Sequence, residues 1–182
     1  MNPVPLHITE TLNHQIRHLG FEPLHVDVPF DEAGIYISTA STALVARLRP
    51  LGIAKARLLA CAPRMLALLE QALAALPDRS FASRCHVPAD LVDRTTTLIN
   101  ETKKAPADAD HDTEGYRFYP EGEKYAVLFA NAQRMLTTLI EIEQALPSAW
   151  QDFEGAPNDL INAIAQTIHE SQSPEPTNPH GL

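Results

Sequence analysis

One helical segment occurs twice in this chain, 70 residues apart, and this repeat constrains the fold more than any other feature. Residues 55–77 and 125–147 align without a gap, and eleven of the 23 paired positions are identical. Two unrelated helices of this composition would share fewer positions, so we infer a duplication. The alternative is that alanine, leucine and arginine recur because all three favour helices.

The repeat predicts an α+β, mainly helical fold with two similar halves, each a strand pair followed by a helix, sharing one core. Two units are too few for a solenoid, which needs at least about three. The small residues and the Met-Leu-x-x-Leu run of both copies would let the helices pack closely, side by side or in equivalent places. We therefore predict a single compact domain over residues 1–170. Residues 171–182 contain too little apolar surface to order themselves and are predicted to be a disordered tail.

Apolar spacing predicts the other elements. In the first 50 residues it predicts a helix capped by Thr9 and stopped by Gly20, a hairpin of residues 24–28 and 35–38, and a helix over 41–48. The next helix, 53–76, contains Pro63, which removes a backbone donor and should kink or break it. Further elements are predicted at 88–103 (helix), 116–118 (strand), 125–146 (one long helix) and 160–168 (helix).

Composition indicates a cytoplasmic protein. The N-terminal residues lack the basic start and apolar core of a signal peptide, and the most apolar stretch, 58–76, carries charged side chains and is expected not to span a membrane. Two well-separated cysteines, Cys61 and Cys85, are expected to be reduced. The expected compartment is the cytoplasm, including that of an infected host.

The acidic residues are unevenly distributed. The net charge is −9, but residues 1–104 hold eleven Lys/Arg and ten Asp/Glu, whereas residues 105–182 hold three and thirteen. Such a run usually serves as a solvated surface. It is also the composition of a face that meets a basic partner, because acidic surfaces complement the Lys/Arg grooves of nucleic-acid machines. The predicted contact residues are Asp108, Asp110, Asp112, Glu114, Glu121 and Glu123.

The run Ala54–Leu69 resembles a segment of small uncharacterised bacteriophage and prophage proteins, in which an Ala-Arg-Leu-x-Ala-x-Ala-Pro-x-x-Leu helix follows a short strand pair. The second copy, Phe129–Leu136, is similar but lacks the proline. Arg64 stands where those proteins usually have an acid. The resemblance covers about 23 residues in each copy, and it implies an origin in mobile elements and a structural helix rather than an active site.

These features together predict a non-enzymatic interaction protein of a phage or other mobile element. Its expected partner is a host protein or protein complex, and its expected role is to inhibit host defence, as an anti-CRISPR protein does. A sequence pI near 5.3 disfavours direct nucleic-acid binding. A homodimer is left open.

The alternative is a domain that binds a small anion or nucleotide, or a small enzyme with an unfamiliar site. Its pocket would lie between the two repeated helices and the hairpin, where Arg64 and Arg134 could clamp an anion; the ordinary interpretation is that both are exposed helix arginines. No metal or cofactor is expected. The aspartate-rich run lacks EF-hand spacing, and His14 and His18 lack the glutamate of a zinc-enzyme motif.

Overall fold

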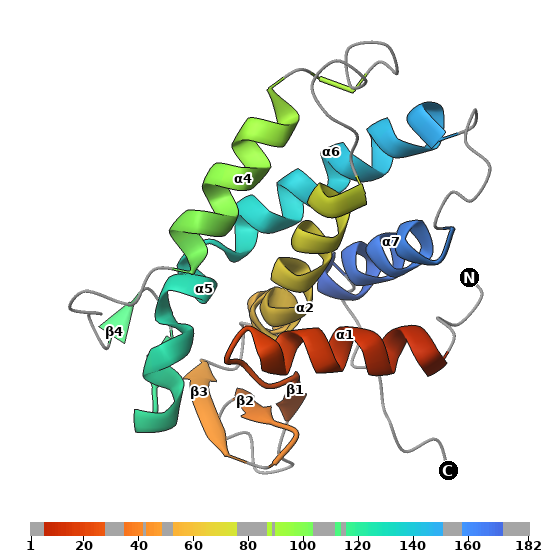
Figure 1. Cartoon of the computed structure of the whole chain (residues 1–182). Helices are drawn as coiled ribbons and strands as arrows, with labels where there is room; N and C mark the ends of the chain where they lie inside the picture. The colour runs from red at the N-terminus through yellow and green to blue at the C-terminus, as the bar shows by residue number, and fades with distance from the viewer. Residues whose placement is uncertain are drawn as a thin grey trace.

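Figure 1 shows the fold in a computed structural model of the chain. The structure describes residues 6–27, 35–41, 43–48, 53–75, 87–88, 90–103, 112–113, 116–150 and 158–172. The helices are α1 (Leu6–His18), α2 (Ile53–Ala75), α4 (Leu91–Thr102), η2 (Pro120–Tyr125, 3₁₀), α5 (Ala126–Ala130), α6 (Ala132–Trp150) and α7 (Asn158–Gln172). The strands are β1 (Leu24–Asp27), β2 (Ile35–Thr39), β3 (Leu44–Leu48), β4 (Asp112–Thr113) and β5 (Tyr116–Phe118). The described residues are mainly helical with one small sheet, which confirms the α+β, mainly helical class.

Helix α2 is the centre of the core. It packs against α1, α4, α6 and α7 and against strands β1 and β2, and Figure 1 shows it, in yellow, among these elements. Its buried residues lie on nearly every side, including Ala56, Leu59, Met65 and Leu69. A helix that is apolar all round is stable in water only when other elements cover it. The rest of the fold is therefore arranged around α2.

The same helix is long and apolar enough, by length and composition, to cross a membrane; it is the one such helix in the described part of the chain. More than half of its most apolar stretch, 56%, is buried inside the protein. A buried core helix meets the same criterion, so composition alone does not assign a membrane span to α2.

Pro63 lies inside α2, which is continuous from Ile53 to Ala75. Of the two predicted effects of this proline, the break is wrong. A proline costs a helix one hydrogen bond, but Pro63 and its neighbours Ala62 and Met65 are buried. Packing around this turn keeps the chain helical on both sides of the proline.

All five strands form one antiparallel sheet in the order β1-β2-β3-β5-β4. The β1–β2 hairpin confirms the predicted one, with Leu24 opposite Thr39; the predicted turn lies outside the described residues. The predicted helix over 41–48 is wrong, because residues 44–48 form β3. Strand β3 pairs with β2 on one side and β5 on the other. Backbone pairing with two partners outweighs a short apolar spacing that also suits a helix.

Helix α1 ends as predicted but begins earlier. Thr9 lies inside the helix and is not its cap, because α1 starts at Leu6. Gly20 has φ +84°. The backbone N–H of Phe21 donates to the Ile16 carbonyl (3.1 Å) and that of Gly20 to the Arg17 carbonyl (3.0 Å). This is the Schellman arrangement, in which a left-handed glycine satisfies the last carbonyls of a helix.

The second copy of the repeat is not the single helix predicted. It begins at the end of η2, continues as α5, is interrupted at Asn131 and resumes as α6, which runs past Pro147 to Trp150. The side-chain amide of Asn131 donates to the Val127 carbonyl (3.1 Å). Asparagine competes in this way with the helical backbone. The equivalent residue of the first copy is Cys61, and α2 is continuous through it.

Helices α2 and α6 pack against each other, which is the first of the two placements that the repeat predicted. Met65 and Met135, equivalent in the two copies, are both 0% exposed. The repeated Met-Leu run therefore forms part of the core in both copies.

The end of α7 differs from its prediction. Ser171 and Gln172 are helical, although the sequence placed them in the tail. Ser171 is 3% exposed and its hydroxyl donates to the Ile168 carbonyl (2.8 Å), so side-chain burial extends the helix. Residues 173–182 lie outside the described residues, and a single domain over 1–170 stays a prediction.

Candidate functional site

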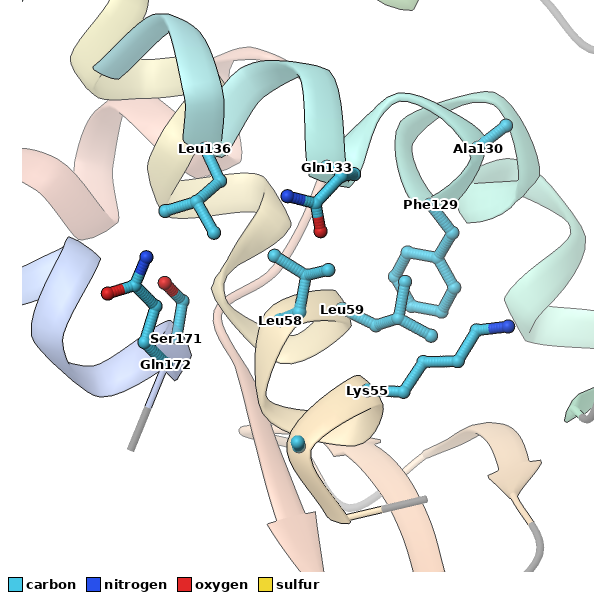
Figure 2. Close-up of a pocket in the computed structure, with 10 residues that line it drawn as sticks. Lys55, Leu58, Leu59, Phe129, Ala130, Gln133, Leu136, Ser171 and Gln172 are labelled. Atoms are coloured by element: carbon cyan, nitrogen blue, oxygen red, sulfur yellow. The ribbon is translucent and has the colours of Figure 1, made fainter. Parts of the chain in front are cut away.

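A pocket lies between the two copies of the repeat. Figure 2 shows its lining side chains, which come from α2, from α5 and α6, and from the end of α7. Its volume is about 650 Å³, within the range of about 300–1,000 Å³ of small-molecule sites. The lining residues are Ala54, Lys55, Leu58, Leu59, Phe129, Ala130, Gln133, Leu136, Ser171 and Gln172.

Leu59 and Phe129 make the buried part of this pocket. They are 2% and 3% exposed, and they are equivalent positions of the two copies. Packing fixes the Phe129 ring, whose centroid lies 5.5 Å from that of Phe118 and 5.9 Å from that of Tyr125. An aromatic ring held by two others keeps its position without a ligand. The pocket is therefore preformed.

Tyr125 anchors this aromatic cluster. Its ring is 0% exposed and lies 5.2 Å from the Phe21 ring, and its hydroxyl accepts a hydrogen bond from the backbone N–H of Glu22 (3.0 Å). Burial raises the pKa of this phenol. The hydroxyl stays protonated at neutral pH. Its hydrogen bond joins the residues just before β1 to the start of the second copy of the repeat.

The polar groups of the pocket stand at its two ends. Lys55 belongs to the first turn of α2, and Figure 2 shows its stem passing below Phe129, whereas Ser171 and Gln172 stand at the opposite end. Gln133 lies above Leu58 between them. One end thus carries a cation close to the positive end of the α2 dipole. The other end carries the Ser171 hydroxyl and the Gln172 amide, which can donate or accept hydrogen bonds.

The structure does not bring Arg64 and Arg134 together in one described pocket. The Arg64 guanidinium pairs with Glu170 of α7 at 2.5 Å, beside a pocket of about 260 Å³ between α1, α2 and α7. The Arg134 guanidinium pairs with Glu101 of α4 at 2.7 Å, beside a pocket of about 430 Å³ between α4 and α6. Each arginine has a carboxylate partner from another helix, so both serve helix packing.

Only some of the six predicted acidic residues are among the residues that the structure describes. Asp112 lies in β4, opposite Arg117 of β5, and Glu121 and Glu123 lie in η2. The Glu123 side chain is exposed. The remaining three, Asp108, Asp110 and Glu114, lie outside the described residues. Because β4 and η2 both adjoin β5, the described members lie at one end of the sheet.

Other late carboxylates take part in ion pairs inside the fold. Glu141 of α6 pairs with Arg94 of α4 at 2.7 Å, and Glu170 pairs with Arg64. Part of the acidic excess after residue 105 therefore balances arginines of the first half and holds helices together, which the charge count could not reveal.

Within the described ranges, no three His, Cys, Asp or Glu side chains gather closely enough to hold a metal ion. His14 and His18 lie in α1. Cys61 is a buried free thiol, and burial raises its pKa to about 11; Cys85 lies outside the described residues. The Cys61 thiol is therefore protonated at neutral pH, the form that does not act as a nucleophile.

Sequence reasoning placed a pocket between the repeated helices and the hairpin, with the two arginines in it. The described pocket does lie between α2 and α6, but α7 closes it in place of the hairpin. Lys55, Gln133 and Gln172 were missed as site residues, since no local pattern indicates which helix end covers a groove. The chain matches no protein-family model, no curated protein and no solved structure in the comparisons. Its function is therefore argued from its residues.

Proposed function

We propose that this chain is a non-enzymatic protein of a phage or other mobile element that binds a basic surface of a host protein complex. The observation that carries the proposal is the acidic segment, residues 108–123, which holds six carboxylates and one arginine. Such a charge density raises the rate of encounter with a Lys/Arg surface and selects against acidic partners.

The part of the acidic segment that the structure describes packs against strand β3, which supports this role. The backbone N–H of Tyr119 donates to the Val45 carbonyl (3.0 Å). Gly122 lies so close to β3 that a Cβ there would stand 1.9 Å from the Val45 oxygen. This contact fixes η2 against the sheet, so the exposed carboxylate of Glu123 is presented from an ordered turn. Preorganised contacts cost less entropy on binding.

Two late carboxylates outside the acidic segment have a different role. Those of α6 and α7, Glu141 and Glu170, pair with arginines of other helices. The acidic segment is the denser group, and its described members Asp112, Glu121 and Glu123 belong to β4 and η2. We assign partner binding to this segment and helix packing to Glu141 and Glu170.

The concrete form of the proposal is an inhibitor of host defence acting in the host cytoplasm, such as an anti-CRISPR protein. CRISPR effector complexes hold nucleic acid in positively charged channels, and an acidic segment can compete for such a channel. The phage-like segment Ala54–Leu69 supports the mobile-element origin.

We also propose that the fold arose by duplication into two similar strand-and-helix halves. Strands β1–β3 precede α2, and strands β4 and β5 precede the second copy of the repeat. Both sets belong to one sheet, and α2 packs on α6. These contacts support a shared core for the two halves.

The test compares two double variants with the same change in net charge. Glu121→Lys with Glu123→Lys alters the acidic segment, whereas Glu10→Lys with Glu143→Lys alters carboxylates of α1 and α6. Binding is measured by surface plasmon resonance to purified CRISPR effector complexes and to immobilised polylysine, at several salt concentrations. We expect the first variant to slow association about tenfold or more and the second to change it little. Equal losses in both would show that net charge, and not the segment, governs binding.

The second candidate function, small-molecule binding, is favoured by the pocket in Figure 2. The arginine clamp does not support it, because Arg64 and Arg134 line separate pockets. A thermal-shift screen with nucleotides and cyclic dinucleotides tests the nucleotide form of this function. A melting temperature that no nucleotide raises would argue against it.

A further inference from the structure

We propose that strand β1 binds an extended peptide of a partner protein as an added antiparallel strand. One apolar side chain of the peptide enters the pocket between α1, α2 and α7, and a lysine or arginine lies opposite Asp27. This surface is separate from the acidic segment, so the inference goes beyond the partner binding proposed above. Three features select the ligand: the open edge of β1, the pocket beside it and the charge on its outer face.

Strand β1 lies at one end of the strand order, and none of the described residues pairs with its outer side (Figure 1). The N–H of Ala40 donates to the Pro23 carbonyl (3.1 Å), which makes Pro23 a hydrogen-bonded position of the β1–β2 ladder. Such positions alternate along an antiparallel strand. The backbone groups of Leu24 and Val26 therefore point away from β2, and the open side of β1 offers two N–H groups and two carbonyls.

This edge selects an extended backbone. An added strand matches the N–H and carbonyl groups of an open edge with its own, whereas a helix already satisfies its backbone groups internally. Leu24 and Val26 are also only partly buried against the core, and an added strand would cover more of both side chains.

The pocket beside this edge selects one side chain of the peptide. Its volume is about 260 Å³, which holds on the order of nine non-hydrogen atoms at about 30 Å³ each. The Arg64 guanidinium pairs with Glu170 (2.5 Å), and Glu170 accepts a hydrogen bond from the Gln166 amide (2.6 Å). These polar groups match one another, so the pocket favours a leucine or phenylalanine side chain. Its apolar walls are Leu12, Ile16, Leu24, Ala60, Pro63 and Ala163.

Leu24 connects the edge to the pocket, because its backbone faces the open side and the residue lines the pocket. Directly opposite residues of two strands lie on the same face of a sheet. The peptide residue opposite Leu24 therefore directs its side chain to the face where the pocket lies. Helices α1 and α7 line the same pocket. A second copy of the chain would bring its own helices into this space, so the edge suits a single peptide strand.

The outer face of β1 selects a basic residue. The side chains of His25 and Asp27 are 46% and 50% exposed. The Ser38 hydroxyl donates to the Asp27 carboxylate (2.6 Å), and the His25 Nε2 lies 3.3 Å from the same oxygen. These contacts hold the carboxylate in place, and a carboxylate accepts several hydrogen bonds at once. A cation directly across from it stabilises the strand pair, and an anion destabilises it.

The three features together define a peptide pattern. Four successive residues of an antiparallel peptide lie opposite Asp27, Val26, His25 and Leu24 in turn. The first residue is basic, the second and fourth are apolar, and the fourth is at the pocket. The probe is therefore acetyl-Gly-Lys-Val-Thr-Leu-Gly-amide with a fluorescent label, and its binding to the full chain is measured by fluorescence anisotropy.

The first experiment changes the probe. N-methylation of its valine removes an N–H that faces β1 and should weaken binding about fivefold or more. N-methylation of its threonine, whose N–H faces away from β1, is the matched control and should change affinity little. Replacing its leucine by alanine should weaken binding at least about tenfold, and replacing its lysine by glutamate about threefold or more.

The second experiment changes the protein. Val26→Pro removes one N–H of the open side, an orientation in which an edge strand tolerates proline, and should weaken the probe about fivefold or more. Thr9→Trp, at an exposed lining position, fills the pocket and should weaken it at least about tenfold. His14→Trp, at an exposed position of α1 outside the pocket, is the control. Asp27→Asn should reduce the preference for lysine over glutamate in the probe.

Circular dichroism and melting curves verify that each variant folds. If Val26→Pro fails to fold, the N-methylated valine probe tests the same strand pairing without changing the protein. The Glu121→Lys, Glu123→Lys variant should bind the probe within about twofold of the unchanged chain, because salt screens distant charges. This variant separates a failure of the β1 site from a failure of the acidic segment.

Several results would overturn the proposal. They are the absence of saturable binding, equal affinities of the two N-methylated probes, and undiminished binding to both Val26→Pro and Thr9→Trp. Sedimentation velocity provides a further test, since self-association that Val26→Pro abolishes would mean that a second copy occupies the edge. Probe binding that appears only after removal of residues 1–5 and 173–182 would mean that a terminal segment of the chain occupies it.

Discussion

Replacing Leu69 by alanine tests the central position of α2. Leu69 is 0% exposed, and the change removes three carbon atoms from the core without altering helix propensity much. At about 0.8 kcal/mol for each buried methylene, the transfer term is about 2.4 kcal/mol. The cavity left behind adds up to about 2 kcal/mol where neighbours cannot relax. We expect the free energy of unfolding to fall by about 2.5 to 4.5 kcal/mol.

Leu73→Ala, one turn later in the same helix, is the matched control. Leu73 is only partly buried against the core, so its loss should be about half as large. Both variants are measured by urea unfolding and by melting. For a chain of this length, about 2–4 °C per kcal/mol predicts that Leu69→Ala lowers Tm by about 5 to 18 °C. A loss below about 1 kcal/mol for Leu69→Ala, or equal losses in both variants, would refute the packing described for α2.

Three further predictions concern single positions. Gly20→Ala should cost about 1–2 kcal/mol in urea unfolding, because φ is +84° although the space around it is open. Gly122→Ala should cost more, at least about 3 kcal/mol, because its Cβ would meet the Val45 carbonyl oxygen at 1.9 Å; equal costs would mean that η2 does not press on β3. Burial raises the pKa of Cys61 from 9.0 to about 11, so between these values the unfolded thiol ionises first and stability falls as pH rises. Unfolding curves from pH 8 to 11 should show this fall, and Cys61→Ala should reduce it; an unchanged slope would contradict the burial.

Periodicity predicted most of the helices because their apolar spacing is long enough to be unambiguous. Helices α2, α4 and α7 lie close to their predicted ranges. Residues 44–48 were predicted wrongly, because a short run of apolar residues suits a buried helix and a buried strand alike. Pairing with β5, which lies about 70 residues later in the chain, decides in favour of the strand.

The candidate site is formed by contacts between helices that lie far apart in the sequence. A local sequence pattern does not indicate such contacts. Arg64 pairs with Glu170, 106 residues away, and this partner cannot be identified from either local sequence. The repeat did predict that the two copied helices adjoin, and the pocket lies between them. The helix that closes the pocket, α7, could be identified only from its packing against α2 and α6.

The central place of α2 has a consequence for how the protein is made. Helix α7 is the element that packs most extensively on α2, yet it is translated long after it. At about 5–20 residues per second, α2, the most apolar helix that the structure describes, is synthesised several seconds before its main cover. During that interval a chaperone that shields apolar helices can bind α2, and the core described above is complete only when α7 has emerged.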